Sequence, residues 1–321
     1  MTGAGELRPD PNTRTELLEH VADLVARVPI AHPLRVAIDG ITASGKTTFA
    51  AELAAAVRAL GRPCVGVSMD GFHNPRALRY RQGRDSADGY YEDAYDFAAL
   101  RTALLDPLGA GGDLRYRTAV YDLGRDAPVD QPAELAPRDL VVIVDGTFLQ
   151  RHELNNAWDV VVFLRASFDE ARRRGATRDA ELAGSAEAAQ ERFDARYHAA
   201  CRRYLDEVDP ERIADVVVDN DDPSAPRIIR VVPELTRVQP HLRRTRAFFG
   251  ERAARWEDRF PDDDAAYADA IAELRPAPGG VVIDLGCGTG RALPHLRRAV
   301  GPDGVVIGID ATSQMLDVIR A

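Results

Sequence analysis

The stretch Gly40-Ile-Thr-Ala-Ser-Gly-Lys-Thr47 decides how this chain can fold, because it follows the pattern G-x-x-x-x-G-K-[ST]. A segment with a strand pattern, LRVAID at 34–39, leads into it, and residues 47–60 show helical spacing of apolar side chains. In such a strand–loop–helix unit, glycines let the backbone curl so that amide N–H groups and the helix N-terminus face one anion. The stretch predicts a phosphate-binding loop in an α/β fold. The plain alternative is a glycine-rich turn that only caps a helix.

Lys46 is the only lysine in the sequence, although 41 of its 321 residues are basic. A slim, flexible ammonium group can reach the β- and γ-phosphates of a nucleotide, whereas the planar guanidinium of arginine substitutes poorly at this position. The next residue, Thr47, carries a hydroxyl that can ligate Mg²⁺. We therefore expect Lys46 and Thr47 to contact the phosphates and the metal ion of a bound nucleotide.

Four further apolar segments rich in β-branched residues lie at 63–69, 140–145, 159–164 and 214–219. Near-continuous apolar runs between helical patterns indicate buried parallel strands. We expect a three-layer α/β domain with a parallel sheet over residues 33–232, preceded by a helix and leader at 1–32. Residues 233–321 begin with linker helices rich in arginine and aromatic residues and continue into a second strand–turn–helix unit at 280–292.

Two carboxylates are expected at the sheet edge that carries the phosphate-binding loop. Asp70 follows the segment 63–69, where a carboxylate can accept the proton of an acceptor hydroxyl or orient it. The alternative for Asp70 is a capping or turn residue. Asp145 ends the segment 140–145, at the position from which a second magnesium contact normally comes. Together with the loop, they indicate phosphoryl transfer.

An arginine-rich helix follows the segment 159–164, in the stretch SFDEARRRGATRD. Arg174 and Arg178 are four residues apart and share one helix face, where two guanidinium groups can clamp a transferring phosphoryl group. For Arg172 and Arg173 we expect pairing with nearby acidic side chains on a solvated face.

Composition excludes several classes of protein. The net charge of −10 and the pI near 5.3 disfavour a nucleic-acid binder. The three cysteines, Cys64, Cys201 and Cys287, are too far apart for a disulfide framework or a zinc site, which suits a reducing cytoplasm. The N-terminus has no signal-peptide core, and no run of about 18 apolar residues predicts a membrane span. We expect a cytoplasmic protein without membrane or nucleic-acid partners. The oligomeric state stays open.

The first domain resembles the uridine kinase-like P-loop kinases, a family that includes phosphoribulokinase and pantothenate kinase relatives. The resemblance spans about residues 33–232 and rests on GITASGKTT, SMDGFH, DAYDFAAL, VYD at 120–122, VVIVDG, RRRGATRD and ADVVVDNDDP. It implies a P-loop NTPase fold and transfer of the γ-phosphoryl group of Mg-ATP to an alcohol group of a nucleoside or sugar. The ATP contacts that we expect are Gly40, Thr42, Ser44, Gly45, Lys46, Thr47, Thr48 and, near adenine, Asn220.

By the same resemblance, Asp70 is the catalytic base, Arg174 and Arg178 lie in a mobile lid, and Tyr121 lies in the acceptor pocket. Thr47 and Asp145 would be the metal contacts. Two family residues are missing. The first is an aspartate that holds the ribose hydroxyls in the family; Tyr90 or Tyr91 stands near its place, and Asp88 or Asp93 could take its role. The second is a histidine, in whose place this chain has Asp126 or Arg125. The acceptor is therefore a nucleoside or another sugar or pantothenate-like alcohol.

The second strand–turn–helix unit carries its own glycine-rich loop, Val282-Ile-Asp-Leu-Gly-Cys-Gly-Thr-Gly290, with Asp310 at the end of a following strand. Glycines allow close backbone approach and a distal acid can hold a ribose. The motif DLGCGTG resembles that of class I S-adenosylmethionine-dependent methyltransferases. The resemblance implies cofactor contacts from Asp284, Gly286, Gly288 and Asp310. A plain strand–helix corner is the alternative.

Only 41 residues follow Gly280, which predicts a partial Rossmann-like segment rather than a finished methyltransferase domain. We expect no methyltransferase activity from it. Two other functions stay open from the sequence. The chain could be a methyltransferase whose first domain only senses nucleotide, or a nucleotide-binding switch without an acceptor.

Overall fold

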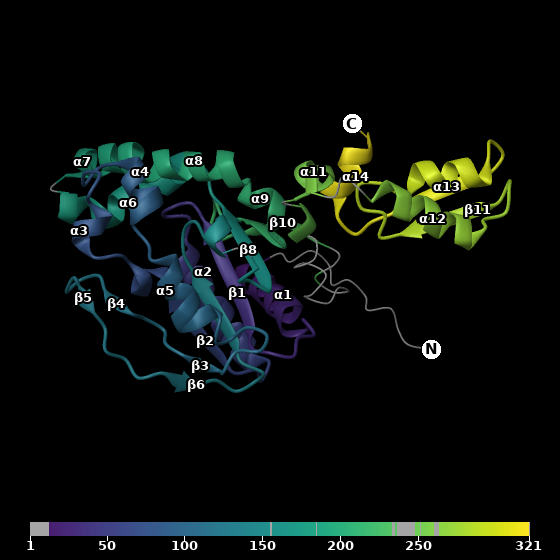
Figure 1. The fold of residues 1–321 in the computed structure, drawn as a ribbon. Coiled ribbons are helices and arrows are strands. Elements are labelled where there is room, and N and C mark those ends of the chain that lie inside the picture. Colours follow the sequence, from purple (N-terminus) through teal and green to yellow (C-terminus); the bar gives the residue numbers. More distant parts are fainter. Residues whose placement is uncertain are drawn as a thin grey trace. The chain divides into compact units, whose positions relative to one another are not determined.

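A six-stranded sheet forms the centre of the first unit of the protein, which is described here from a computed structural model (Figure 1). Its strands run in the order β10-β9-β8-β1-β7-β2. Five of them are parallel, and β10 pairs antiparallel with β9. Their bounds are β1 Leu34–Gly40, β2 Cys64–Ser68, β7 Val141–Asp145, β8 Val160–Arg165, β9 Val216–Asp219 and β10 Arg227–Val231. The predicted α/β fold with a parallel sheet is confirmed, and each of the five predicted apolar segments is a parallel strand.

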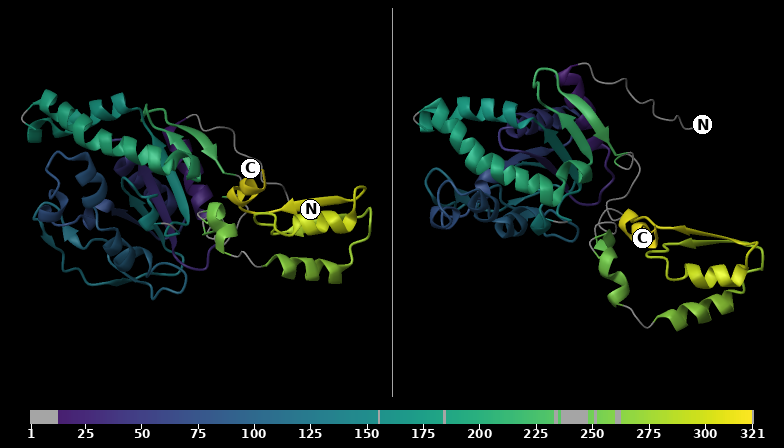
Figure 2. Two further views of the ribbon diagram at one scale, coloured as in Figure 1. Left: turned by 45° about the horizontal axis from the view of Figure 1, so that its top comes forward. Right: turned by 90° about the horizontal axis from the view of Figure 1, so that it is seen from above.

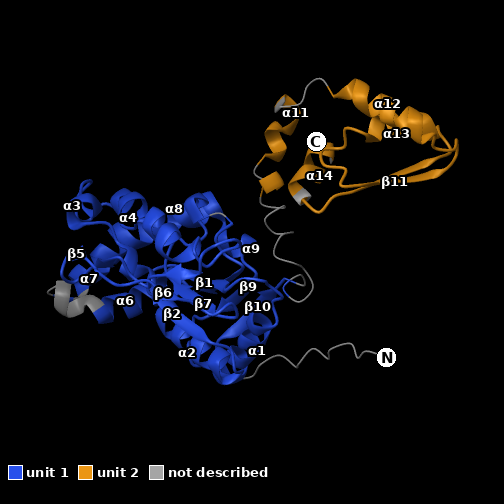
Figure 3. Ribbon diagram, turned by 60° about the horizontal axis from the view of Figure 1, so that its bottom comes forward, with its two compact units in different colours: residues 1–238 blue, residues 239–321 orange. Residues whose placement is uncertain are grey.

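The structure describes residues 13–154, 156–183, 185–232, 235, 248–250, 252–259 and 263–320. The chain divides into two compact units, residues 1–238 and residues 239–321 (Figure 3). Among the described residues, none of the helices combines the length and the apolar character that a membrane crossing requires.

Helices cover both faces of the sheet, which gives three layers. On one face, α1 (Arg14–Ala26) and α2 (Lys46–Ala59) bury apolar side chains against alternate strand residues such as Val36 and Ile143. On the other face, alternate residues such as Val144 pack against α4 (Ala87–Asp93), α5 (Phe97–Leu100) and α8 (Ala199–Val208). This alternation follows from the strand period of two, because successive side chains point to opposite faces.

The first unit has further helices and two small strand pairs outside its central sheet. Figures 1 and 2 show α6, α7 and α8 together on one side of the unit. The helices of this unit whose bounds have not yet been given are α3 Arg76–Arg79, α6 Phe168–Ala183, α7 Ala186–Arg192 and α9 Pro210–Ile213. Its short helical segments are η1 Met69–Phe72, η2 Arg101–Leu105, η3 His152–Leu154 and η4 Phe193–His198. Two small antiparallel pairs join β3 Arg115–Tyr116 to β6 Glu134–Leu135 and β4 Tyr121–Asp122 to β5 Ala127–Pro128. Gly175 of α6 lies so close to Phe193 that a Cβ there would meet the ring at 1.9 Å.

The second unit contains a two-stranded parallel sheet of β11 (Val281–Leu285) and β12 (Val305–Ile309). Its other elements are η6 Ala253–Arg255, α11 Trp256–Arg259, α12 Asp264–Leu274, α13 Leu293–Val300 and α14 Ser313–Arg320. The strand–turn–helix unit predicted from position 280 is present. Alternate strand residues form an apolar face that is 41–77 % exposed, consisting of Val281, Ile283, Leu285, Val305, Ile307 and Ile309.

A buried ion pair joins the two central strands β1 and β8. Asp159, which immediately precedes β8, accepts hydrogen bonds from the backbone N–H, Nε and Nη2 of Arg35, each at 2.9 Å. The two side chains are only 3 % and 1 % exposed. Removing one partner of such a pair leaves an uncompensated buried charge.

We predict that Asp159→Ala lowers the free energy of unfolding of the first unit by about 3–5 kcal/mol. Urea unfolding followed by circular dichroism measures the change. The control is Asp169→Ala, which removes an exposed partner of Arg172 and should change stability by less than about 1 kcal/mol. Equal losses of unfolding free energy in the two variants would contradict the proposed contribution of the buried ion pair to stability.

Candidate active site

A cavity of 630 Å³ opens where β1, β2 and β7 end at their carboxyl edge. In open α/β sheets, ligands bind at this edge. The cavity is lined by the loop after β1, the start of α2, the segment after β2, Asp145 to Thr147 after β7, and parts of α6 and η4. Of the residues predicted from the sequence, it brings together Thr42, Gly45, Lys46, Thr47, Thr48, Asp70, Asp145, Arg174 and Arg178.

The loop between β1 and α2 has the backbone shape that an anion site requires. Gly45 adopts a left-handed φ of 95° at the N-cap of α2, and Gly40 passes so close to Leu164 that a Cβ would meet the carbonyl oxygen at 2.6 Å. The Ser44 hydroxyl is buried without a hydrogen-bond partner in the described structure. Lys46 donates from Nζ to the carbonyl of Ile41 at 2.6 Å. Burial lowers the pKa of Lys46, against the opposing charges of nearby Asp39 and Asp145.

Asp39, near the end of β1, holds the start of this loop. Its fully buried carboxylate accepts hydrogen bonds from the N–H of Gly40 at 2.8 Å, from Nε2 of Gln150 at 2.9 Å and from the hydroxyl of Tyr204 on α8. Burial raises the pKa of Asp39, although these hydrogen bonds oppose the shift. The carboxylate therefore ties the start of the loop to the segment after β7 and to α8.

Thr47 and Asp145 meet directly at the cavity wall. The Thr47 hydroxyl donates to Oδ2 of Asp145 at 2.7 Å. Burial raises the pKa of Asp145, while the Thr47 hydrogen bond and the Lys46 charge oppose that rise. Both side chains offer hard oxygen atoms. The described residues include no cluster of three or more His, Cys, Asp and Glu that would hold a metal ion alone.

Asp70 lies on η1, just after β2, and its side chain is 68 % exposed at the cavity. Ser68 caps this turn by accepting the N–H of Asp70 at 3.3 Å. His73 closes the turn, with Nδ1 at 3.1 Å from the Asp70 carbonyl oxygen and 3.8 Å from its carboxylate. Burial lowers the pKa of His73. The neutral imidazole is therefore the major form of His73 at pH 6.5 and above.

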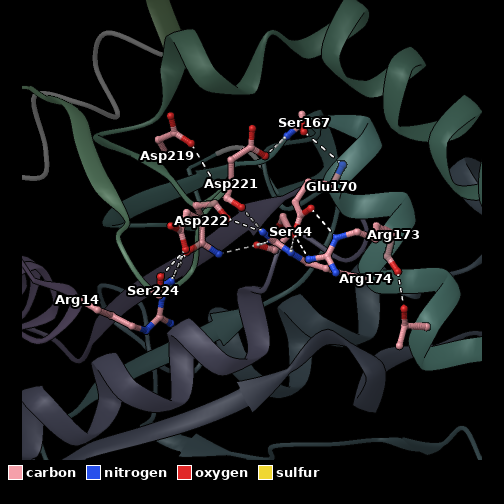
Figure 4. Close-up of polar contacts among 12 residues, drawn as sticks. Arg14, Ser44, Ser167, Glu170, Arg173, Arg174, Asp219, Asp221, Asp222 and Ser224 are labelled. Carbon is pink, nitrogen blue, oxygen red and sulfur yellow. Dashed lines mark hydrogen bonds and ion pairs between the residues drawn. The ribbon is translucent and has the colours of Figure 1, made fainter.

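Arg174 contacts the backbone around the phosphate-binding loop (Figure 4). It donates to the carbonyl oxygens of Asn220 at 3.0 Å and Asp221 at 2.6 Å, and it reaches the Ser44 carbonyl at 3.5 Å. Glu170 of the same helix holds its Nε at 2.7 Å. Arg178 lies one turn further along α6, at the exposed rim of the cavity.

Arg172 and Arg173 form ion pairs with acidic side chains, as the sequence predicted for a solvated face. Arg173 lies 2.6 Å from Glu170, and Arg172 lies 2.8 Å from Asp194 and 3.3 Å from Asp169. Hydrogen bonds from Arg173 and Arg174 lower the pKa of Glu170 to about 2.

Asn220 is buried against the loop rather than lining the cavity. Its Nδ2 donates to the Ser44 carbonyl at 2.7 Å, and its Oδ1 lies 3.4 Å from Nη1 of Arg14. Arg14 comes from α1, where it also donates to the Pro223 carbonyl at 2.8 Å and pairs with Glu52 of α2. No local motif marks Arg14, so the sequence analysis missed this contact.

Three residues predicted for the acceptor do not line the cavity. The Tyr121 hydroxyl donates to Asp126 at 3.0 Å. Asp88 is exposed and pairs with Arg203 at 2.9 Å. Asp93 is buried, and its carboxylate binds Arg81 at 2.6 Å and Gln82 at 2.8 Å.

Aromatic and arginine side chains line the cavity where the sequence analysis expected carboxylates. The Tyr90 hydroxyl, near the place of the missing aspartate, lies 3.2 Å from Oγ1 of Thr42 and 3.4 Å from the hydroxyl of Tyr95. Lining residues to which the sequence analysis gave no role include Met69, Arg79, Tyr80, Tyr95, Thr147, Arg196 and Tyr197, and His73 and Tyr90 line the cavity as well. The density of tyrosines between positions 80 and 95 was a usable signal for part of this set.

The glycine-rich loop of the second unit is held by Asp310. Its carboxylate accepts the N–H of Gly288 at 2.9 Å and of Thr312 at 2.7 Å. Gly286 and Gly288 have left-handed φ values of 85° and 55°, and nothing lies within 4 Å of a Cβ built on either. Burial and the nearby Asp310 raise the pKa of Asp284. Binding of S-adenosylmethionine here stays a prediction.

Sequence comparisons separate the two units. Residues 276–321 match the family model of a methyltransferase domain. Uridine-cytidine kinase B of Dictyostelium discoideum is 24 % identical over 188 residues, which covers 58 % of this chain and 74 % of that protein. An uncharacterized 37.1 kDa protein in transposon Tn4556 of Streptomyces fradiae is 41 % identical over 66 residues. That match spans 20 % of this chain and only 19 % of the relative's length.

Two solved structures share the fold of the first unit at 26 % identity and a TM-score of 0.50. One is a possible uridine kinase from Bacillus stearothermophilus, with coverage of 62 % of this chain and 96 % of that one. The other, from Silicibacter sp. TM1040, is proposed to be a fructose transport system kinase, with coverage of 59 % and 94 %. The N-terminal part of the chain is thus similar to uridine kinase-like P-loop kinases, and its C-terminal part is similar to a methyltransferase domain.

Proposed function

We propose that the first unit transfers the γ-phosphoryl group of ATP to an alcohol group of a small molecule. The observation that carries this proposal is that Lys46, Asp70 and Asp145 line one cavity, so that an ammonium group and an exposed carboxylate face the same space. A binding protein without transfer needs no exposed carboxylate there. Likeness to P-loop kinases supports the same reaction class.

The reaction needs one base and several cations. The acceptor hydroxyl oxygen forms a bond to the γ-phosphorus, the bond from that phosphorus to the bridging oxygen of ADP breaks, and Asp70 accepts the hydroxyl proton. Lys46 and the arginines of α6 stabilise the negative charge on the transferring group. Arg174 also positions the phosphate-binding loop through the backbone contacts of Ser44 and Asn220.

Magnesium fits the oxygen atoms of Thr47 and Asp145, which lie 2.7 Å apart. Mg²⁺ in such sites takes few protein ligands and completes its shell with phosphate oxygens and water. When bound, it would neutralise charge on the β- and γ-phosphates. Thr47 would contact it directly, and Asp145 would hold it directly or through water.

The acceptor is, within this proposal, a nucleoside or another sugar or pantothenate-like alcohol. Four tyrosines, Tyr80, Tyr90, Tyr95 and Tyr197, line the cavity together with His73. Such rings can stack on a base or pack against the carbon face of a sugar. The tyrosine at position 90 cannot accept two ribose hydroxyls in the manner of an aspartate, which weakens the case for uridine itself.

We predict that Asp70→Asn reduces acceptor-dependent ADP release by roughly 10²–10⁴-fold, because the amide cannot accept the proton. ADP release is measured across nucleosides, sugars and pantothenate-like alcohols, with Lys46→Ala as the blank and calorimetry to confirm that ATP still binds. Asp206→Asn, an exposed carboxylate on α8, makes the same chemical change away from the cavity and should leave turnover intact. Unchanged turnover in Asp70→Asn would disprove its role as the base.

A second prediction concerns pH. Because burial lowers the pKa of His73 below its ordinary value of 6.5, more than half of the imidazole is neutral at pH 6.5 and the neutral fraction grows above it. The dependence of kcat/KM on pH should therefore have the same shape in the wild type and in His73→Asn from pH 6.5 to about pH 8. A step in this range that is present only in the wild type would show that His73 titrates there.

A third prediction tests the support of the loop by α1. Arg14→Ala removes the contacts to Asn220 and Pro223, so we expect the KM for ATP to rise roughly 3- to 10-fold with little change in kcat. Steady-state kinetics at saturating acceptor measure both constants. Arg27→Ala removes an exposed arginine at the other end of α1 and serves as the control. A fall in kcat at constant KM would contradict a positioning role.

A further inference from the structure

Two buried arginines line the cavity without a role in the mechanism above. Arg79 ends α3 and is 4 % exposed, and Arg196 lies in η4 and is 5 % exposed. Both line the same cavity as Asp70. A guanidinium group is charged at any physiological pH, and buried charges are normally paired.

The pairing of Arg79 is incomplete. Its Nη2 lies 3.2 Å from Oδ1 of Asp126, which also accepts the Tyr121 hydroxyl and the N–H of Arg76. Its Nε and Nη1 are buried and have no hydrogen-bond partner in the described structure. Buried polar groups without partners are rare in folded proteins, and an unsatisfied charged donor is especially costly. Arg79 thus lines the cavity with a guanidinium group that is only partly paired within the described structure.

Arg196 has no carboxylate partner among the described residues. Its Nη1 donates to the backbone carbonyl oxygens of Arg84 and Ser86. Its guanidinium carbon lies 5.3 Å, 5.2 Å and 5.7 Å from the ring centroids of Tyr80, Tyr90 and Tyr197. Carbonyl groups and aromatic faces solvate this charge but do not neutralise it.

Arg79 and Arg196 both contact the ring of Tyr80 and both line the cavity. The Arg79 guanidinium lies 5.5 Å from the ring centroid of Tyr80, close to the 5.3 Å of Arg196. These two arginines differ from the cations at the phosphate-binding loop. Arg174 contacts the backbone of Ser44, whereas the hydrogen bonds of Arg79 and Arg196 go to residues between 84 and 126. The cavity thus holds one set of cations for the phosphates of ATP and a second set elsewhere.

We propose that the acceptor alcohol carries an oxyanion, a phosphate or a carboxylate, and that Arg79 and Arg196 bind this group while Asp70 faces the reacting hydroxyl. The proposal rests on the phosphotransferase function proposed above and narrows its substrate class. It favours sugar phosphates and hydroxy acids over neutral nucleosides. Planar guanidinium groups suit both oxyanions, because their N–H donors match two oxygen atoms at once.

The first experiment compares pairs of alcohols in which only one member carries an oxyanion. The pairs are ribose 5-phosphate with ribose, uridine 5′-monophosphate with uridine, glycerate with glycerol, and pantothenate with its alcohol analogue. Acceptor-dependent ADP release gives kcat/KM for each member. We expect the charged member of at least one pair to exceed the neutral one by roughly 10- to 100-fold. The pairs with phosphate and those with carboxylate distinguish the two oxyanions. Equal or better turnover of every neutral member would overturn the proposal and leave the kinase function standing.

Substitutions of the two arginines test whether they cause the preference for the charged acceptor. Arg79→Gln and Arg196→Gln should each reduce the charged-to-neutral ratio of kcat/KM, and Arg79→Lys should restore part of it by keeping the charge. The matched control is Arg76→Gln, which removes an exposed charge three residues away on the same helix and also near Asp126. A ratio that falls equally in Arg76→Gln, or that persists in both cavity variants, would show that the preference arises elsewhere.

A binding measurement separates this inference from the proposed function. Calorimetry measures the binding affinity of both members of the pair with the largest preference, or of ribose 5-phosphate and ribose if no alcohol is turned over. Saturating ADP is present so that the phosphate-binding loop is filled. Tighter binding of the charged member that is lost in Arg79→Gln supports the oxyanion site even if no transfer occurs. Equal binding of the two members, or a difference that Arg79→Gln leaves unchanged, overturns it.

Discussion

The buried carboxylate of Asp39 is the interaction on which the rest of the site depends. It receives hydrogen bonds from the first turn of the phosphate-binding loop, from Gln150 and from Tyr204, so three distant segments meet at one point of the sheet edge. A buried carboxylate is tolerated only where such donors surround it. The loop therefore begins at a fixed position, and the places of Lys46 and Thr47 follow from it.

The same architecture explains how α6 can serve two purposes. Arg174 holds the loop at Ser44 and the segment after β9 at Asn220, while Arg178 on the next turn stands at the rim of the cavity. One helix face thus links the shape of the loop to the position of a second cation. The close fit of Gly175 against Phe193 keeps this helix against η4, which carries Arg196. A displacement of α6 would therefore move Arg174 and Arg178 and also Arg196 of η4.

Much of the fold could be predicted from the sequence, because its signals are local. The five parallel strands and the phosphate-binding loop each occupy a short stretch with its own pattern. The acceptor side could not be predicted in this way. Arg79 and Arg196 are more than a hundred positions apart, and only the packing of α3 and η4 against α4 brings them to one tyrosine. Tyr121 shows the opposite case, since the expected acceptor residue instead supports Asp126.

The single lysine of the chain has a consequence for chemical labelling. Lys46 is the only side-chain amine, it is buried beside the phosphate-binding loop, and its pKa is lowered by that burial. A lowered pKa leaves more of the amine in its neutral, nucleophilic form. Acylation of this one side chain would therefore read out whether the loop is filled, without background from other lysines.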